Sequence, residues 1–210
     1  MIACRNAMRT ELPEYTEVEF EQSLERAKKL VRSSAESKDV KCHDNFLTGI
    51  RVSFDLVYPG YISPELQRYN WIDIVTSSSK MHRLLKMDLD KCCNKYVSQA
   101  TIDQLQWDID VWNKIDAYEW QEGMTLPFVL RNESLVAETK KDALYYAFMR
   151  CVSDCPNGLE LFMRVSTNYK QLQTIYHQRK NHKLVEDWQE GFCRDFVKEL
   201  PYAKEFITGE

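Results

Sequence analysis

The stretch NYKQLQTIYHQR, residues 168–179, has the periodicity that most constrains the fold. In a helix each residue turns the chain by about 100°, so Asn168, Leu172, Ile175 and Arg179 fall on one stripe. That stripe is apolar in its middle and carries an amide at one end and a guanidinium at the other. A buried unpaired charge is too costly, so Arg179 needs a partner, either an internal carboxylate or the anion of a ligand.

The composition describes a globular protein. The chain has 210 residues, of which 44% are hydrophobic and 29% charged, enough for one good core. Its net charge of -4 argues against duplex nucleic acid as a partner, because a duplex needs a basic face, but it leaves room for a nucleotide. The sequence has neither a long apolar run nor a signal peptide. We therefore expect a cytoplasmic protein without a membrane partner.

The cysteines and histidines point away from a metal site. Seven cysteines are scattered along the chain without a CxxC pair, and none of the four histidines lies at metal-ligand spacing. We expect reduced, structural thiols and no bound metal.

Hydrophobic periodicity predicts several helices and a few strands. Ile50–Leu56 alternates apolar and polar residues and predicts a half-buried strand. Ser63-Pro64-Glu65 is a strong helix start and predicts a helix to about Val75, which the hydroxyl-rich Thr76–Ser79 then breaks. Further expected elements are helices at 17–38, 99–120, 139–154 and 185–199, a second strand at 159–165, and a loop or short hairpin at 121–137.

These elements predict an α/β (α+β) fold, in which a mixed β-sheet is flanked by helices. Residues 1–40 are assigned to an N-terminal arm and a charged helix, and residues 41–210 to a single domain. Polar side chains gather at the ends of elements, where scaffolds present ligand-binding groups and helix termini accept anions. The Thr76–Ser79 turn is either a plain solvated loop or a phosphate or ribose site.

The C-terminal segment resembles a signature of the flavin-dependent thymidylate synthases, the ThyX family. Their pattern is roughly N-x-R-x-L-x-x-F-L-x-x-R, followed by H-A-Q-W-E. The eleven-residue step from Asn to Arg is kept as Asn168 to Arg179. The following His and Trp appear as His182 and Trp188, with about three extra residues between them.

The N-terminal half carries a second resemblance. Family members have a G-H-x-T/S-x-x-E/H stretch before an alternating strand, and here Cys42–Phe46 leads into Ile50–Leu56. The sequence is also similar to phage and prophage proteins that keep the H-D-N-F, M-H-R and T-N-Y-x-Q-L-x-T-I-Y-x-Q-R-x-N-H segments.

The resemblance implies a homotetramer that binds FAD and a pyrimidine nucleotide such as dUMP between subunits. By position it places at the flavin His43, Asn45, Asn168, Lys170, Thr174 and His182. It places at the nucleotide Asp73, Ser78, Ser79, Arg83 and Arg179.

The chain departs from the family at its central motif, R-H-R-x-x-S-x-N-E-x-S-x-R. When the last Arg is placed on Arg83, Trp71-Ile72-Asp73 stands where R-H-R belongs. An aspartate in place of an arginine inverts the charge and cannot hold a phosphate. It could instead accept a hydrogen bond from an exocyclic amino group, which favours a cytosine-type ligand such as dCMP.

Two functions follow from these observations. The first is a divergent flavoprotein that transfers a methyl or one-carbon group to a pyrimidine deoxynucleotide, with the flavin supplying the redox chemistry. The second is a non-catalytic phage protein on the same scaffold that binds a nucleotide or a host protein. No residue is assigned a catalytic role.

Overall fold

The computed structural model describes residues 4–5, 10, 15–34 and 44–209. For residues 35 and 36 it describes the backbone but not the side chains. His43 and Cys42 therefore lie outside the described residues. The chain divides into two compact units. Unit 1 comprises Met1–Asp55, Gln67–Val75 and Arg164–Glu210, and unit 2 comprises Leu56–Leu66 and Thr76–Met163.

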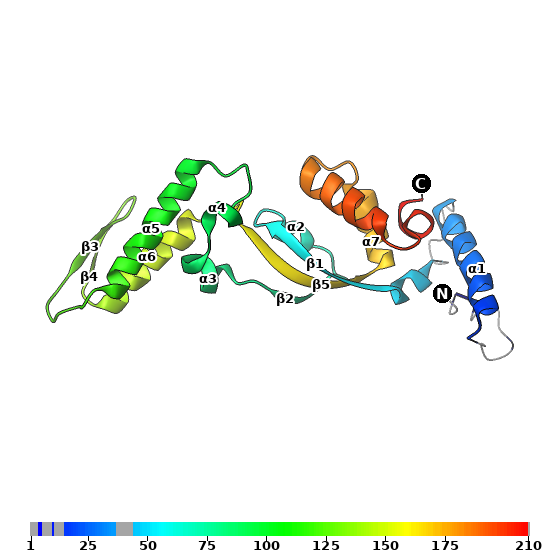
Figure 1. Cartoon of the computed structure of the whole chain (residues 1–210), viewed down its shortest axis with the longest axis horizontal. Coiled ribbons are helices and arrows are strands. Elements are labelled where there is room, and N and C mark those ends of the chain that lie inside the picture. The colour runs from blue at the N-terminus through cyan, green and yellow to red at the C-terminus, as the bar shows by residue number, and fades with distance from the viewer. Residues whose placement is uncertain (1–3, 6–9, 11–14, 37–43, 210) are drawn as a thin grey trace. The chain divides into compact units, whose positions relative to one another are not determined.

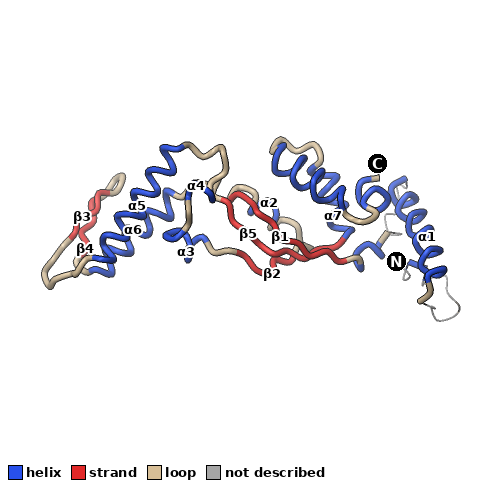
Figure 2. Tube along the Cα trace, in the orientation of Figure 1, coloured by secondary structure: helices blue, strands red, loops and turns tan. Residues whose placement is uncertain are grey.

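A three-stranded sheet contains the predicted strands. Its order is β1 (Arg51–Pro59), β5 (Glu160–Asn168) and β2 (Asp73–Ser77), and Figure 2 shows these strands in red. The β1–β5 pair runs antiparallel, because Tyr169 N bonds Ile50 O at one end and Gly60 N bonds Leu159 O at the other. Both strands predicted from the sequence are confirmed, and burial along β1 alternates as expected.

Unit 1 packs its helices around α7 (Tyr169–Arg179). Its other elements are α1 (Glu17–Glu36), the short 3₁₀-helices η2 (Asn45–Gly49) and η5 (Val197–Glu199), and the π-helices η4 (Val185–Phe196) and η6 (Lys204–Thr208). Leu172 and Ile175 on α7 are fully buried, which confirms the apolar middle of the predicted stripe. Phe206 of η6 and Trp188 of η4 complete this core.

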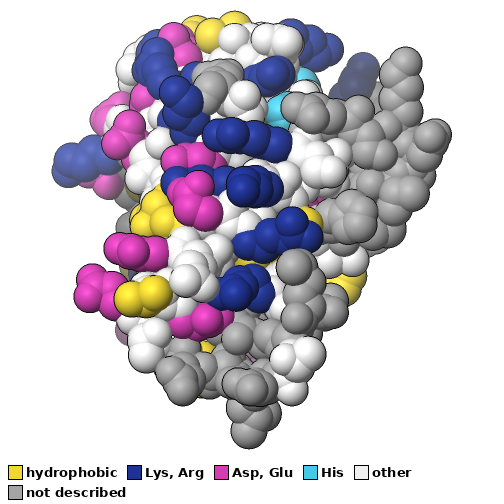
Figure 3. Space-filling view, turned by 90° about the vertical axis from the view of Figure 1, so that its right-hand side faces the viewer, with side chains coloured by type: hydrophobic (Ala, Val, Ile, Leu, Met, Phe, Trp, Pro, Cys, Tyr) yellow, Lys and Arg dark blue, Asp and Glu magenta, His cyan; other side chains and the backbone are white. Residues whose placement is uncertain are grey.

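Helix α1 has a buried face and a charged one. Ala27 and Val31 are buried, whereas the opposite side is rich in Lys, Arg and Glu. Figure 3 looks at this end of unit 1 and shows basic side chains interspersed with acidic ones. Lys28 pairs with Glu25 at 3.0 Å, so these charges form an ordinary solvated helix face.

Unit 2 is built on a helix pair and a hairpin (Figure 1). The pair is α5 (Gln99–Ala117) and α6 (Lys140–Asp154), and the antiparallel hairpin joins β3 (Leu126–Val129) to β4 (Ser134–Ala137). Short helices complete the unit: α2 (Ser63–Leu66), α3 (Lys80–Arg83), η3 (Leu84–Lys86) and α4 (Leu89–Cys92). The two long helices and the hairpin match the prediction.

The predicted helix from Ser63 to Val75 is wrong. The Ser-Pro-Glu start gives only α2, which ends at Leu66, and the chain becomes strand β2 at Asp73. The reason is that β2 carries Ile74, Val75 and Thr76 in succession, and β-branched side chains favour extended backbone. Apolar side chains recur every three residues before β2, and this spacing resembles that of a helix.

The helix expected at 185–199 is present with a different winding. Residues 185–196 form a π-helix and residues 197–199 a 3₁₀ turn. No helix in the described part of the chain is long and apolar enough to cross a membrane. The mixture of helices and antiparallel sheet confirms the predicted fold class.

Candidate functional site

Asn168 forms the N-cap of α7. Its side-chain oxygen accepts a hydrogen bond from Gln171 N at 2.9 Å, and the residue is only 4% exposed. An Asn at this position satisfies one of the amide groups that a helix leaves open at its start. The amide end of the predicted stripe is therefore used to begin the helix.

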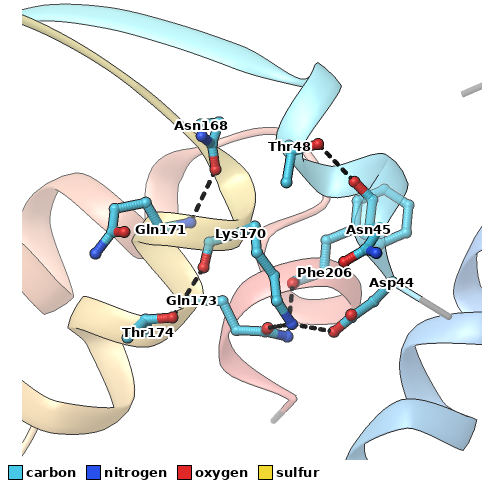
Figure 4. A network of polar contacts seen from close by, with 9 residues as sticks. All are labelled: Asp44, Asn45, Thr48, Asn168, Lys170, Gln171, Gln173, Thr174 and Phe206. Atoms are coloured by element: carbon cyan, nitrogen blue, oxygen red, sulfur yellow. Dashed lines mark hydrogen bonds and ion pairs between the residues drawn. The ribbon is translucent and has the colours of Figure 1, made fainter. Parts of the chain in front are cut away.

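Lys170 is held in an internal ion pair (Figure 4). Its ammonium lies 2.5 Å from Asp44 Oδ2 and 3.2 Å from Gln173 Oε1. The Asp44 side chain is 4% exposed, and its other oxygen, Oδ1, makes no hydrogen bond with any described group. A buried carboxylate oxygen without a donor is costly, so Asp44 Oδ1 is a ready acceptor.

The other two described flavin candidates from this end of α7 are in the same neighbourhood (Figure 4). Thr174 donates its hydroxyl to Lys170 O at 3.1 Å, inside its own helix. The carbonyl of Asn45 accepts from Thr48 Oγ1 at 2.7 Å, while its exposed side-chain amide bonds to no described residue. The structure thus brings together Asn45, Asn168, Lys170 and Thr174 within unit 1.

Arg179, at the other end of α7, is held by aromatic rings. Its Nε donates to Tyr69 Oη at 2.8 Å, and its guanidinium lies 5.7 Å from the Tyr69 ring centre and 4.7 Å from that of Trp188. The Tyr69 hydroxyl in turn donates to Gln178 Oε1 at 3.0 Å. These contacts orient a half-buried cation whose flat shape suits a phosphate or carboxylate.

His182 shares the Trp188 ring with Arg179. Its ring centre lies 6.2 Å from Trp188, edge to face, and its Nδ1 accepts a hydrogen bond from Leu184 N at 3.3 Å. In the neutral imidazole the proton then resides on Nε2. The structure therefore groups Arg179 and His182 around one indole, which we call the Trp188 cradle (Tyr69, Arg179, His182, Trp188).

Asp73 on β2 faces a basic side chain. Its carboxylate lies 3.9 Å from Arg51, and both side chains are largely exposed. An ion pair of this length in solvent contributes little stability. The carboxylate that stands in place of the family's basic motif is thus partly offset by a cation from β1.

The remaining nucleotide candidates lie in unit 2. Ser78 Oγ accepts from Phe162 N at 3.0 Å, which ties β5 to the segment after β2. Ser79 caps α3 by accepting from His82 N at 3.4 Å. Arg83 is exposed, and its backbone N bonds Ser79 O.

Tyr69 and Gln178 join the candidate site through their contacts, although no sequence pattern pointed to them. Tyr69 lies in the segment that was wrongly predicted as a helix, and it reaches Arg179 across 110 residues of chain. Short-range periodicity carries no information on such a contact. Trp188 was identifiable because a Trp follows the His in the family pattern, although about three extra residues separate the two here.

Comparison with known proteins supports the fold and leaves the family open. No protein-family model matches the sequence, and no curated protein matches it significantly. The structure of flavin-dependent thymidylate synthase ThyX from Helicobacter pylori, complexed with FAD and dUMP, is similar with a TM-score of 0.56 and 11% identity.

A second structure from Helicobacter pylori, Thymidylate Synthase X with FAD and dUMP, has a TM-score of 0.56 and 12% identity. Each likeness covers 98% of this chain and 89% of the other. The chain therefore has a ThyX-like fold. At this identity the likeness concerns the fold alone.

Proposed function

We propose that the protein binds a pyrimidine deoxynucleotide and FAD at the two ends of α7. The observation that carries the proposal is the Trp188 cradle, which presents an oriented guanidinium on a ThyX-like fold. The two similar Helicobacter pylori structures hold FAD and dUMP, which supports the same two classes of ligand here.

The nucleotide anion is assigned to Arg179. A guanidinium fixed by Tyr69 on one side and Trp188 on the other loses little side-chain entropy when it binds. Asp73 is assigned to the exocyclic amino group of a cytosine-type base, because a carboxylate accepts hydrogen bonds and cannot donate them. Ser78, Ser79 and Arg83 remain candidates for the nucleotide through their position in the family motif.

The residues assigned to the flavin suit the hydroxyl groups of FAD better than its pyrophosphate. Lys170 is already neutralised by Asp44, so this pair offers no net positive charge to a pyrophosphate. Asp44 Oδ1 lacks a donor, and a ribityl or ribose hydroxyl would supply one. Asn45, Asn168, Lys170 and Thr174 are therefore assigned to the hydroxyl-bearing part and the ring of the flavin, and the bound flavin would supply redox chemistry for one-carbon transfer. His182 is a flavin candidate by family position alone, because it lies beside Arg179 in the Trp188 cradle.

A second candidate function is binding without turnover. It is favoured by Trp71-Ile72-Asp73, which replaces two cations of the central motif with an indole and a carboxylate. On this alternative the protein is a non-catalytic phage protein that binds a nucleotide or a host protein.

We also propose that the protein assembles as the homotetramer that the family resemblance implies. Trp71, Ile74 and Val75 are 65%, 43% and 57% exposed, and clustered large apolar side chains mark protein contacts. Light scattering on the purified protein tests this assembly, and a monomer at micromolar concentration would contradict it.

Absorbance and binding measurements test the proposed function. Purified protein titrated with FAD should perturb the flavin absorbance, and dUMP or dCMP should bind with an affinity that Arg179→Gln lowers by about tenfold or more, as for one lost charge-assisted contact. The matched control is Arg68→Gln, which removes an exposed arginine elsewhere in unit 1. Equal nucleotide affinity in Arg179→Gln and Arg68→Gln, or an unchanged flavin spectrum, contradicts the proposal.

A conversion assay on the same purified protein distinguishes the two proposed functions. Conversion of dUMP or dCMP that depends on reduced flavin supports the enzyme. Binding of both ligands without any conversion supports the non-catalytic protein.

A further inference from the structure

A groove in unit 2 lies apart in sequence from the residues assigned above. It runs between the end of the β3–β4 hairpin and one face of α6, and its volume is about 440 Å³. Cavities that hold small organic ligands begin at about 300 Å³, so this groove is large enough for one. Its lining includes Leu130, Arg131, Tyr146, Met149, Arg150 and Asp154.

Two arginines line the groove, and the hydrogen-bond donors of their guanidinium groups are unused among the described residues. Arg131, on the hairpin turn, has neither a hydrogen bond nor an ion pair with any residue in the described part of the chain. Arg150, on α6, lies 3.0 Å from Asp108 Oδ1, yet that oxygen makes no hydrogen bond, so the contact is electrostatic only. An arginine carries five N–H donors, and an acceptor that enters the groove can use them.

Residues of α5 hold the Arg150 side chain in position. Its guanidinium lies 5.2 Å from the centre of the Trp107 ring, and Asp108, 2% exposed, sits beneath it on α5. Burial is the main cause that raises the pKa of the Asp108 carboxyl, and Asp154 acts in the same direction, while Gln104 and Arg150 oppose them. The cation is thus oriented before any ligand arrives, which reduces the entropy lost on binding.

The remaining walls are apolar and aromatic. The Tyr146 ring packs edge to face on Phe128 at 5.6 Å, and this contact fixes one side of the groove. Met149 and Leu130, each 37% exposed, flank it. With Asp154 as the one acidic wall residue, the lining has two cations and one anion.

We propose that this groove binds an amphipathic organic anion, a ligand with a flat apolar or aromatic body and one negatively charged group. The body packs on Tyr146 and Met149, and the anion is held between Arg131 and Arg150. The site does not rest on the proposed flavin and nucleotide function, because none of its residues was assigned to either ligand.

Fluorescence titration of the full-length protein tests the site with 8-anilinonaphthalene-1-sulfonate, an aromatic sulfonate. We expect saturable binding at one site, and about fivefold weaker binding of the uncharged N-phenyl-1-naphthylamine, as for one partly exposed ion pair. Arg131→Glu should weaken the sulfonate by at least the same factor, because it replaces an attraction with a repulsion. Since Arg131 has no described partner, its substitution should leave the melting temperature unchanged.

A second variant and a matched control locate the site. Met149→Glu places a negative charge on the apolar wall and should also weaken the sulfonate. Lys114→Glu makes the same charge change as Arg131→Glu at a different cavity of unit 2, about 240 Å³ in volume, and should not. The proposal is overturned if the wild type shows no saturable binding, if both probes bind equally, or if Lys114→Glu weakens the sulfonate as much as Arg131→Glu does.

Discussion

The two ends of α7 use similar polar side chains for different purposes. At the N-terminal end Asn168 caps the helix and Lys170 is paired with Asp44, so the chain satisfies most of these groups itself. At the C-terminal end Arg179 is supported by Tyr69 and Trp188, which orient the cation through ring faces and one neutral hydroxyl. Polar residues at family-like positions are therefore held by polar groups of the chain at one end of the helix and by aromatic rings at the other, where we propose that the nucleotide binds.

The largest effect should come from breaking the Asp44–Lys170 pair. Lys170→Met leaves a carboxylate that is 4% exposed without its cation, which should cost about 3 kcal/mol of unfolding free energy. Urea unfolding followed by circular dichroism measures it. The double variant Asp44→Asn/Lys170→Met should recover most of the loss, and a loss that persists in the double variant would show that the charge is not the cause.

Removal of the N-cap should have the next largest effect. Asn168→Ala removes the acceptor for Gln171 N and should lower the unfolding free energy by about 1 kcal/mol. Thr174→Val serves as the control, because its hydroxyl only bonds a carbonyl within the helix. If both variants unfold at the same urea concentration, Asn168 is not acting as the cap.

The other end of α7 should respond in affinity rather than in stability. Tyr69→Phe removes the hydroxyl that accepts from Arg179 Nε but keeps the ring, so nucleotide affinity should fall by about fivefold, as for one hydrogen bond. The melting temperature should change little. A large fall in stability with unchanged affinity would instead give Tyr69 a purely structural role.

The smallest effect concerns Cys193 in η4, close in sequence to Trp188. Burial raises the pKa of its thiol to about 11. The reactive thiolate is therefore rare at pH 8, and labelling by a disulfide reagent should be slow and accelerate about tenfold per pH unit. Mass spectrometry of the labelled protein identifies the residue, and rapid labelling at pH 8 would mean that η4 opens readily around the cradle.

The raised pKa of Cys193 also predicts a loss of folding stability at alkaline pH. The unfolded thiol ionises near its ordinary pKa of 9.0, whereas the folded thiol keeps its proton to about pH 11. The stability that the protonated Cys193 thiol contributes is complete below pH 9 and is lost as the pH rises towards 11. Cys193→Ala should show less of this loss between these two values.

The sequence predicted the elements that follow a single strong period. The alternation in β1 and the apolar stripe of α7 were sufficient, because each reflects burial against a neighbouring surface. The segment 63–75 was mispredicted because a real helix start at Ser63 was followed by β-branched residues whose pairing with a distant strand decides the structure.

The candidate site was predictable only in part. Asn168, Arg179 and His182 were found because they lie within one segment with regular spacing. Tyr69 joins Arg179 from 110 residues away, and Asp44 joins Lys170 from 126 residues away. Contacts of this kind depend on the tertiary fold, and no local pattern encodes them.

The division of the chain into units has a consequence for the order in which it folds during synthesis. Unit 2 is nearly continuous in sequence, whereas unit 1 joins Met1–Asp55 and Gln67–Val75 to the distant Arg164–Glu210. At about 5–20 residues per second, Asp44 leaves the ribosome roughly 6 to 25 s before Lys170. During that interval Asp44 lacks its cation and the buried Leu47 lacks α7, so the early part of unit 1 waits while most of unit 2 is already available to fold. A pause or cut before Arg164 would thus leave an exposed apolar surface for chaperones to cover.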